Sequence, residues 1–390
     1  MEDVAEHFND LLHKIAKEKF GNDYSIDIKP ISSGGANYTS KLYAVTIKGG
    51  SDVLNMFAKV AAVGEKFRSQ APRFYDTERF FYTKLMKIYE KLEEEHQIPD
   101  QYKLFFPEFY GCNPNVSEET IVLENLVMKG YEAYDRFKSI DWPYATSAVK
   151  ELAKLHALSF AHGKYYPEDC REVIEKLRFE WKFDDPGIKE FMEGFKLKAI
   201  EITREENKDK LQRFFDSSTL EKWGILYKAS RREVLGHGDY RPSNLMHKHR
   251  ADGKVDIKIV DLQTLQGGSP VTDLLYFIFT GSDEQFRAQY YDKLIDHYYT
   301  QLCEAMKRLH LNPDEIYSRE DFDFELKEKL PFGLSLAVFS LPVITVEAEN
   351  APQVNEDLEL SSFSVGKTSD LYAERLNGVI NDYVKWGLLK

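Results

Sequence analysis

Apolar residues alternate with polar ones over short stretches in the first third of the chain and recur at helical spacing over most of the rest. Short alternating runs are typical of half-buried strands, and apolar positions three and four residues apart are typical of amphipathic helices. The first third also contains helix-like runs between its strands. The pattern therefore predicts an α+β fold of two lobes that share a cleft: a small β-rich lobe of residues 1–128 and a large, mainly helical lobe of residues 129–390.

Individual segments fit this division. The main predicted elements are a strand, turn and strand over residues 31–43, strands at residues 55–60, 119–126 and 257–260, and helices at residues 75–82 and 144–162. The uncharged run 330–346 is short for a membrane span and holds a glycine and two prolines, so a buried helical segment is predicted. Residues 350–369 are polar and are predicted to form a surface loop. The charge run 93–95 is predicted to be a solvated helix face.

Asp239, Asn244 and Asp261 carry the most chemical information. The first two lie in the run HGDYRPSN that begins at His237, and Asp261 follows an alternating apolar run, so that it would lie at a strand end. Phosphoryl transfer from ATP needs a carboxylate that accepts the proton of the attacking hydroxyl and oxygen ligands that hold Mg²⁺ against the phosphates. The Asp-to-Asn spacing is that of the protein-kinase catalytic loop. Each residue alone has an ordinary structural explanation, but the ordered set predicts a phosphotransferase site.

The first third of the chain offers a matching nucleotide clamp. Gly34, Gly35 and Asn37 lie in a small-residue turn whose backbone N–H groups can approach phosphate oxygens, although such a turn can also be only a hairpin. Lys59 stands among apolar residues of the next predicted strand, where an ammonium needs an anion. The ATP phosphates and Glu78, in the next predicted helix, are the candidates. A lysine that reaches solvent and a solvated glutamate are the alternatives.

Glu124, Asn125 and Leu126 end an apolar run that begins at Glu119. In a kinase, the strand between the lobes ends in a hinge whose backbone groups bind adenine. An ordinary strand end has the same pattern, so the sequence separates the two interpretations poorly.

Together these residues resemble the ecdysteroid kinase-like family, arthropod small-molecule kinases related to choline kinase and the aminoglycoside phosphotransferases. The resemblance runs from about Ile31 to the helices beyond Asp273. It rests on Lys59, Glu78, the hinge sequence VLE, the helical LAKLHA at residues 152–157, the HGD loop with Asn244, the sequence DLQ at Asp261, and PVTDL at residues 270–274. It implies a bilobal protein-kinase-like fold, ATP and Mg²⁺ as cofactors, Asp239 as the base, Asn244 and Asp261 as magnesium ligands, and Asp273 as a brace of the catalytic loop.

Three positions depart from the usual family pattern. Asn125 stands where Asp is usual, Tyr240 and Arg241 stand where a Trp is usual shortly after the catalytic Asp, and Leu262 stands where Phe is usual. None of these departures removes a reacting group, so they concern the subfamily rather than the reaction.

Composition narrows the class of protein. With 390 residues and 43% apolar content the chain is long enough for two lobes, and its formal charge of −13 argues against nucleic acid as a partner. Three scattered cysteines and an acidic N-terminal sequence predict a cytoplasmic protein without a membrane partner. His156 and His237 are expected to brace the structure, since no His or Cys cluster has the spacing of a zinc site. The oligomeric state stays open.

The predicted partner is a small molecule with a hydroxyl group, because residues 261–273 are too short for the activation segment of a protein kinase. Residues 168–228 and the C-terminal helices are expected to shape its pocket. Their aromatic side chains can bury a steroid or can simply be core packing: Phe179, Trp181, Phe183, Phe191, Phe195, Trp223, Tyr290, Tyr291, Tyr298, Tyr299 and Phe339.

Three hypotheses follow. The first is an ATP-dependent kinase of an ecdysteroid or similar hydrophobic acceptor, which inactivates a hormone or detoxifies a dietary compound. The second is the same chemistry on choline, ethanolamine or an aminoglycoside-like polyol. The third is a catalytically silent nucleotide- or steroid-binding module.

Overall fold

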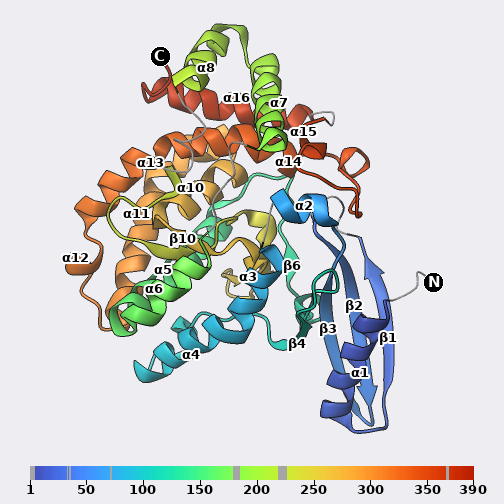
Figure 1. Cartoon of the computed structure of the whole chain (residues 1–390). Helices are drawn as coiled ribbons and strands as arrows, with labels where there is room; N and C mark the ends of the chain where they lie inside the picture. Colours follow the sequence, from blue (N-terminus) through green and yellow to red (C-terminus); the bar gives the residue numbers. More distant parts are fainter. Residues whose placement is uncertain are drawn as a thin grey trace.

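The computed structural model describes residues 5–32, 34, 37–70, 73–178, 185–217, 226–365 and 369–390. An antiparallel sheet forms the N-terminal part, and helices form most of the remainder (Figure 1). The predicted bilobal, protein-kinase-like α+β architecture is therefore confirmed. The boundary at residue 128 stays a prediction.

The N-terminal sheet has the strand order β1-β2-β3-β5-β4, with all neighbours antiparallel. Its strands are β1 (Ser25–Ile31), β2 (Ser40–Gly49), β3 (Asp52–Ala61), β4 (Phe109–Asn113) and β5 (Thr120–Glu124). Helix α1 (Glu6–Phe20) covers one face through a cluster that includes Phe8 and Leu12 (Figure 1). Met56, Ala58 and Val60 of β3 belong to this cluster, and the alternation of the strand turns Lys59 to the opposite face.

That opposite face meets a second group of helices. They are α2 (Glu65–Gln70), α3 (Phe74–Phe80) and α4 (Met86–Glu95), with a π-helical turn, Phe81–Leu85, between the last two. The predicted solvated face at residues 93–95 is wrong for Glu93, which is only 5% exposed. Its carboxylate accepts a hydrogen bond of 2.7 Å from the Leu104 amide, and burial raises the pKa of Glu93 to about 7.

The large lobe is built around long helices whose starts are capped. The side chains of Asp141, Asp283, Ser318 and Ser369 accept backbone N–H groups of the first turns of four of these helices. The helices are α5 (Trp142–Tyr165), α6 (Pro167–Lys176), α7 (Pro186–Ile202), α8 (Glu205–Ser217), α10 (Pro270–Gly281), α11 (Glu284–Arg308), α12 (Pro313–Ile316), α13 (Arg319–Phe339), α14 (Leu341–Ile344), α15 (Ser362–Val365) and α16 (Asp370–Lys385).

Short strands in the large lobe hold the loops of the site. They are β6 (Glu132–Ala133), β7 (Val234–Gly236), β8 (Leu245–His249), β9 (Val255–Ile259) and β10 (Gln266–Gly268). Because β7 pairs with β10 and β8 pairs with β9, the loop that follows β7 lies beside the loop that follows β9. Asp239 and Asp261 are on these two loops.

The C-terminal segment departs from the sequence prediction. Residues 350–369 were expected to be a surface loop, but Leu358 and Leu360 are buried, and the backbone of Glu356 lies against Gly64 near the sheet. The uncharged run 330–346 is the buried end of α13 followed by α14, as predicted. None of the helices in the described parts of the chain combines the length and the apolar character that crossing a membrane requires.

Candidate active site

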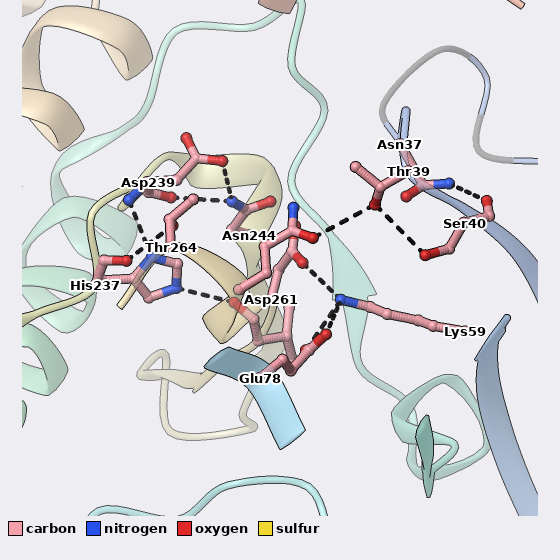
Figure 2. A network of polar contacts seen from close by, with 12 residues as sticks. Asn37, Thr39, Ser40, Lys59, Glu78, His237, Asp239, Asn244, Asp261 and Thr264 are labelled. Carbon is pink, nitrogen blue, oxygen red and sulfur yellow. Dashed lines mark hydrogen bonds and ion pairs between the residues drawn. The ribbon is translucent and has the colours of Figure 1, made fainter. Parts of the chain in front are cut away.

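Lys59 of β3 pairs with one carboxylate from each lobe. Its Nζ lies 3.0 Å from both carboxylate oxygens of Glu78 on α3 and 2.6 Å from Oδ1 of Asp261 (Figure 2). All three side chains are largely buried. Burial alone would lower the pKa of Lys59, but the two carboxylates raise it, so this lysine stays charged.

Asp261 has a backbone conformation that is unusual for its residue type. Its φ of 64° and ψ of 55° lie in the left-handed region, which a residue with a side chain enters at a cost of about 1–2 kcal/mol. Burial would raise the pKa of its carboxyl group, but Lys59 holds that pKa below its usual value. Strain of this kind is concentrated at functional sites, where the surrounding contacts maintain it.

Asp239 lies in the loop between β7 and β8, and its side chain is held on one side. Asn244 Nδ2 donates hydrogen bonds of 2.9 Å to Oδ2 and to the main-chain oxygen of Asp239. The Arg241 side chain pairs with the same carboxylate, with 3.3 Å between Nε and Oδ2. Both contacts use Oδ2, and the Tyr276 hydroxyl also interacts with this carboxylate.

The carboxylate of Asp273 on α10 stabilises this loop. Its carboxylate accepts the backbone N–H groups of His237 at 2.6 Å and Gly238 at 2.9 Å. His156 Nε2 donates to Asp273 at 3.1 Å, while its Nδ1 accepts from the Tyr298 hydroxyl at 2.6 Å. Burial would raise the pKa of Asp273, but the hydrogen bond from His156 keeps it below its usual value. The buried His156 therefore supports the loop rather than facing the site.

A glycine with a special conformation completes the loop. Gly238 has a φ of +81°, and a Cβ atom built on it would lie 2.2 Å from the main-chain oxygen of Thr264. The Thr264 hydroxyl in turn donates to the His237 main-chain oxygen at 2.9 Å (Figure 2). The two loops of the site can approach this closely only with glycine at position 238.

The small-residue turn is anchored by contacts that sequence reasoning missed. Gly34 has a φ of +57°, and its carbonyl oxygen accepts a hydrogen bond of 2.8 Å from Arg136. Gly35 lies outside the described residues. The Asn37 side chain donates to the main-chain oxygen of Ser40, the first residue of β2. Thr39 Oγ1 donates to the Gln263 side chain at 3.4 Å, which ties the turn to the Asp261 loop.

The predicted hinge forms a compact turn. Asn125 accepts the Val127 amide at 3.1 Å and so caps a short 3₁₀ turn, Leu126–Lys129. The Glu124 carboxylate pairs with Lys129. The main-chain N–H groups of Glu124 and Asn125 bond to Glu108 and Asn55, so these contacts fix the strand end against the sheet.

A cavity of about 910 Å³ opens beside Asp239 and Asp261. The three hinge residues are not among the residues that line it, so it is distinct from the place predicted for adenine. Aromatic side chains from both lobes are among the residues that line it: Tyr38, Phe67, Phe74, Phe191, Tyr227, Tyr276, Phe332, Phe339 and Phe363. This size and this apolar character suit a drug-sized ligand.

The predicted aromatic lining is correct only in part. Phe191 of α7 and Phe339 of α13 line the cavity. Phe195 and four tyrosines of α11 instead pack in the hydrophobic core, because α11 lies against α5 on the other side of the lobe: Tyr290, Tyr291, Tyr298 and Tyr299. Phe179, Trp181, Phe183 and Trp223 lie outside the described residues.

Asn244 and Asp261 form a donor set that suits magnesium. Asn244 directs its amide nitrogen to Asp239, which leaves its Oδ1 as a ligand atom, and Asp261 adds a carboxylate. Mg²⁺ is commonly bound through one or two such groups together with substrate phosphates. Over the described ranges, no group of three or more His, Cys, Asp or Glu side chains could hold a metal without such help. The residues therefore fit a metal that arrives with a nucleotide.

Comparisons with known proteins found a matching family model and several similar solved structures. The model of the ecdysteroid kinase-like family matches residues 34–311. No curated protein sequence matches the chain. Among solved structures, the chain is similar to an aminoglycoside-3′-phosphotransferase of type VIII, with 14% identity, 84% of this chain and 99% of that chain covered, and a TM-score of 0.37.

Two further solved structures are similar to this chain. A microcompartment-associated aminopropanol kinase has 11% identity, 97% and 99% coverage of the two chains and a TM-score of 0.46. An ethanolamine kinase of Plasmodium vivax has 10% identity, 81% and 83% coverage and a TM-score of 0.36. The family assignment rests on the family model rather than on these structures.

Proposed function

The chain belongs to the ecdysteroid kinase-like family, and from this premise we propose that it transfers the γ-phosphoryl group of ATP to a hydroxyl group of a hydrophobic small molecule. One observation carries the proposal: Asp239 and Asp261 line a large, mainly apolar cavity, and their carboxylates are held by Asn244 and Lys59, respectively. The proposed reacting groups and the proposed acceptor pocket thus lie next to each other.

Each residue has a role in this reaction. The Asp239 carboxylate accepts the proton of the attacking hydroxyl and orients it. Lys59, held by Glu78, contacts the ATP phosphates in place of Asp261. Asn244 and Asp261 would hold Mg²⁺, which when bound would neutralise charge on the phosphates. The hinge Glu124–Leu126 binds adenine through its backbone, and the turn with Gly34, Gly35 and Asn37 covers the phosphates.

The reaction is a direct displacement. The acceptor oxygen forms a bond to the γ-phosphorus, and the bond from that phosphorus to the bridging oxygen breaks. The electron pair of the broken bond leaves with ADP, and the acceptor proton passes to Asp239. Lys59 and the braced loop hold these groups in line, so that most of the catalysis is positioning and charge neutralisation.

The cavity favours a bulky, mainly apolar acceptor such as an ecdysteroid over a small cation. A quaternary ammonium ligand needs aromatic faces combined with negative charge. Here the lining combines aromatic faces with more basic than acidic side chains, a balance that does not favour a cation, and the cavity is large enough for a polycyclic molecule. Phosphorylation in the cytoplasm would then inactivate a hormone or detoxify a dietary compound.

An acceptor panel tests the proposal. Purified protein is incubated with ATP, Mg²⁺ and ecdysteroids, choline, ethanolamine and aminoglycosides, and the products are analysed by mass spectrometry. We expect a phosphorylated steroid from the wild type and none from Asp261→Asn. Turnover of choline or an aminoglycoside without any steroid would move the assignment to the other acceptor class. A protein that binds ATP but phosphorylates nothing would support a silent binding module.

A further inference from the structure

The charged side chains that line the cavity form two groups. Asp239, Asp261 and Arg241 belong to the reacting end. The second group is one acidic residue, Glu233, and four basic residues, which we call the basic rim: Arg73, Arg178, Lys228 and Arg231. The whole chain contains 65 acidic and 52 basic residues, so this positive excess among the described residues of the lining is opposite to the charge of the molecule.

Strand β7 separates the second group from Asp239. The Asp239 loop follows the last residue of β7, whereas Glu233 precedes the first. A strand rises about 3.3 Å per residue, so the residues on either side of β7, Glu233 and His237, are about 13 Å apart. Glu233 Oε1 would lie 2.8 Å from a Cβ atom added to Gly267, so it sits beside β10 at this far end.

Arg73 and Arg178 lie at the same far end. Arg73 Nη1 donates hydrogen bonds to the main-chain oxygens of Lys176, at 2.6 Å, and of Arg178, at 3.3 Å, so its guanidinium group is fixed beside the end of α6. Burial raises the pKa of Glu233 and Arg178 partly offsets that rise, so Arg178 is close to Glu233. The Arg178 side chain is 47% exposed, so the cavity opens to solvent here.

Residues 227–231 supply the other two cations of the basic rim. The Tyr227 ring would meet a side chain added at Gly268, which pairs with Val234, the first residue of β7. The buried Glu325 carboxylate accepts two N–H groups of this segment, at 2.5 and 3.0 Å, and so holds it in place. The four cations are therefore gathered at the end of the cavity that is farther from the reacting groups.

Apolar walls strengthen the effect of such a rim. A cleft with charges of one sign and low-dielectric walls focuses the electric field and attracts molecules of the opposite charge. Phe74, Phe191 and Met192 are among the apolar side chains that line this cavity. A neutral acceptor would leave the field unused, and a cationic acceptor would be repelled by it. The field suits an acceptor that has an apolar body and a negative group.

Given the kinase function proposed above, we infer that the acceptor is an amphipathic anion. Its hydroxyl group lies at Asp239, its apolar body fills the cavity, and a carboxylate or sulfate group at its other end lies at the basic rim. This names the class of acceptor and leaves the reaction unchanged, because the negative group takes no part in the transfer.

Two matched pairs of steroids test this inference. Estradiol 3-sulfate has a free hydroxyl at the end opposite to its sulfate, and estradiol 3-methyl ether is its neutral partner. Deoxycholate ends in a carboxylate, and its methyl ester is the neutral partner. Two quantities are measured for each steroid: the dissociation constant at low and high salt without ATP, and the rate of phosphorylation with ATP and Mg²⁺.

Variants with one reversed charge show where the negative group binds. Arg73→Glu and Lys228→Glu alter the two sides of the basic rim. Arg250→Glu is the matched control, because Arg250 is on the exposed hairpin between β8 and β9 and is not part of the cavity lining. Thermal unfolding checks that each variant is folded. Lys228 is exposed, so Lys228→Glu decides the matter if Arg73→Glu, which loses two bonds to the end of α6, does not fold.

We expect the wild type to bind each anionic steroid about tenfold more tightly than its neutral partner at low salt. High salt should reduce this difference, because it screens exposed charges. Arg73→Glu and Lys228→Glu should each weaken binding of the anionic steroids about fivefold to tenfold, in keeping with the modest strength of exposed ion pairs, and leave the neutral partners unchanged. Arg250→Glu should bind all four steroids as the wild type does.

Other outcomes would overturn the inference. Equal affinities for the anionic and neutral steroids, or charge reversals that weaken both alike, would show that the basic rim is a solvated surface without a role in binding. A wild type that binds none of the four steroids would also contradict it. If the anionic steroids bind at the rim but no acceptor is phosphorylated, the proposed kinase function fails, while the dissociation constants still establish the anion site.

Discussion

Lys59 shows, at the scale of single residues, how the site keeps buried charges together. Its ammonium lies between Glu78 and Asp261, so each charge has an opposite partner (Figure 2). Removing one partner from such a cluster is costly because an uncompensated charge remains buried. In the proposed reaction, the phosphates would replace Asp261 on Lys59, and Asp261 would turn to the metal. The ion pairs would then hold these groups in place before the substrates arrive.

Gly238 gives a prediction that belongs to this scale. Gly238→Ala places a Cβ 2.2 Å from the Thr264 main-chain oxygen at a φ of +81°, so the loops must separate. Gly253→Ala is the matched control, because its φ of +78° is similar but nothing lies within 4 Å of the new atom. We expect both variants to lose about 1–2 kcal/mol of unfolding free energy from backbone strain. Only Gly238→Ala should lose more than this and also lose phosphoryl transfer.

Chemical denaturation and transfer assays on the two variants check this prediction. Equal stability loss and equal activity in the two variants would mean that the contact between the loops does not position Asp239.

Helix α4 shows why a charge run does not always mark a solvated face. Glu94 is exposed, whereas the neighbouring Glu93 points into the protein and bonds to the Leu104 amide. The sequence contains no signal for this difference, because the burial of Glu93 depends on a segment that packs against α4 from outside the helix. The burial of a single position along a helix follows from its neighbours in space rather than from its residue type.

Glu93 also predicts a pH dependence of stability. Its folded pKa of about 7 is above the usual value of 4.5. Between these two values the folded state binds more protons than the unfolded state, so the free energy of unfolding falls as pH rises from about 4.5 to about 7. In Glu93→Gln this contribution is absent, and the amide oxygen can still accept the Leu104 N–H.

Denaturation at pH 5 and pH 8 measures this effect. At pH 8 we expect Glu93→Gln to be more stable than the wild type by about 1–3 kcal/mol, with little difference near pH 5. Glu94→Gln, at an exposed position, should follow the wild type at both pH values. A Glu93→Gln variant with the same pH dependence as the wild type would contradict the raised pKa.

At the scale of the whole molecule, segments far apart in sequence meet around the cleft. Tyr38, after the small-residue turn, donates to the Val343 main-chain oxygen at 3.3 Å and packs its ring against Phe363, with 4.8 Å between centroids. Arg136 donates to both Gly34 and Ile344. The small-residue turn and the C-terminal wall of the cavity are therefore physically connected.

Arg136→Ala tests this connection. It removes the hydrogen bond of 2.8 Å to Gly34 and that of 2.5 Å to Ile344, so the turn should be less well held. We expect ATP affinity to fall about tenfold, or about 1.4 kcal/mol, in titration calorimetry. Arg250→Ala is the control, since Arg250 pairs with Asp252 and Asp256 on an exposed hairpin. Unchanged ATP affinity in Arg136→Ala would show that the turn is held by other contacts.

The sequence could predict those parts of the site whose residues lie close together in the chain or follow the alternation of a strand. Asp239 and Asn244 meet because they share one short loop, and the strand alternation around Lys59 indicates a buried ammonium that needs an anion. Arg136 and Ile344 could not be paired this way, because 208 residues separate them and no local pattern marks either one. The buried part of residues 350–369 was missed for the same reason. The roles of the site residues and the hinge stay predictions.

In the proposed reaction, the nucleotide, the metal and the acceptor meet at Asp239 and Asp261. A structure with Mg²⁺ and a non-hydrolysable ATP analogue would show directly whether they do. We predict adenine at Glu124–Leu126, phosphates on Lys59, a metal bound by Asn244 and Asp261, and the γ-phosphate directed at Asp239 beside the cavity. A nucleotide bound elsewhere, or a metal without contact to Asp261, would contradict this account.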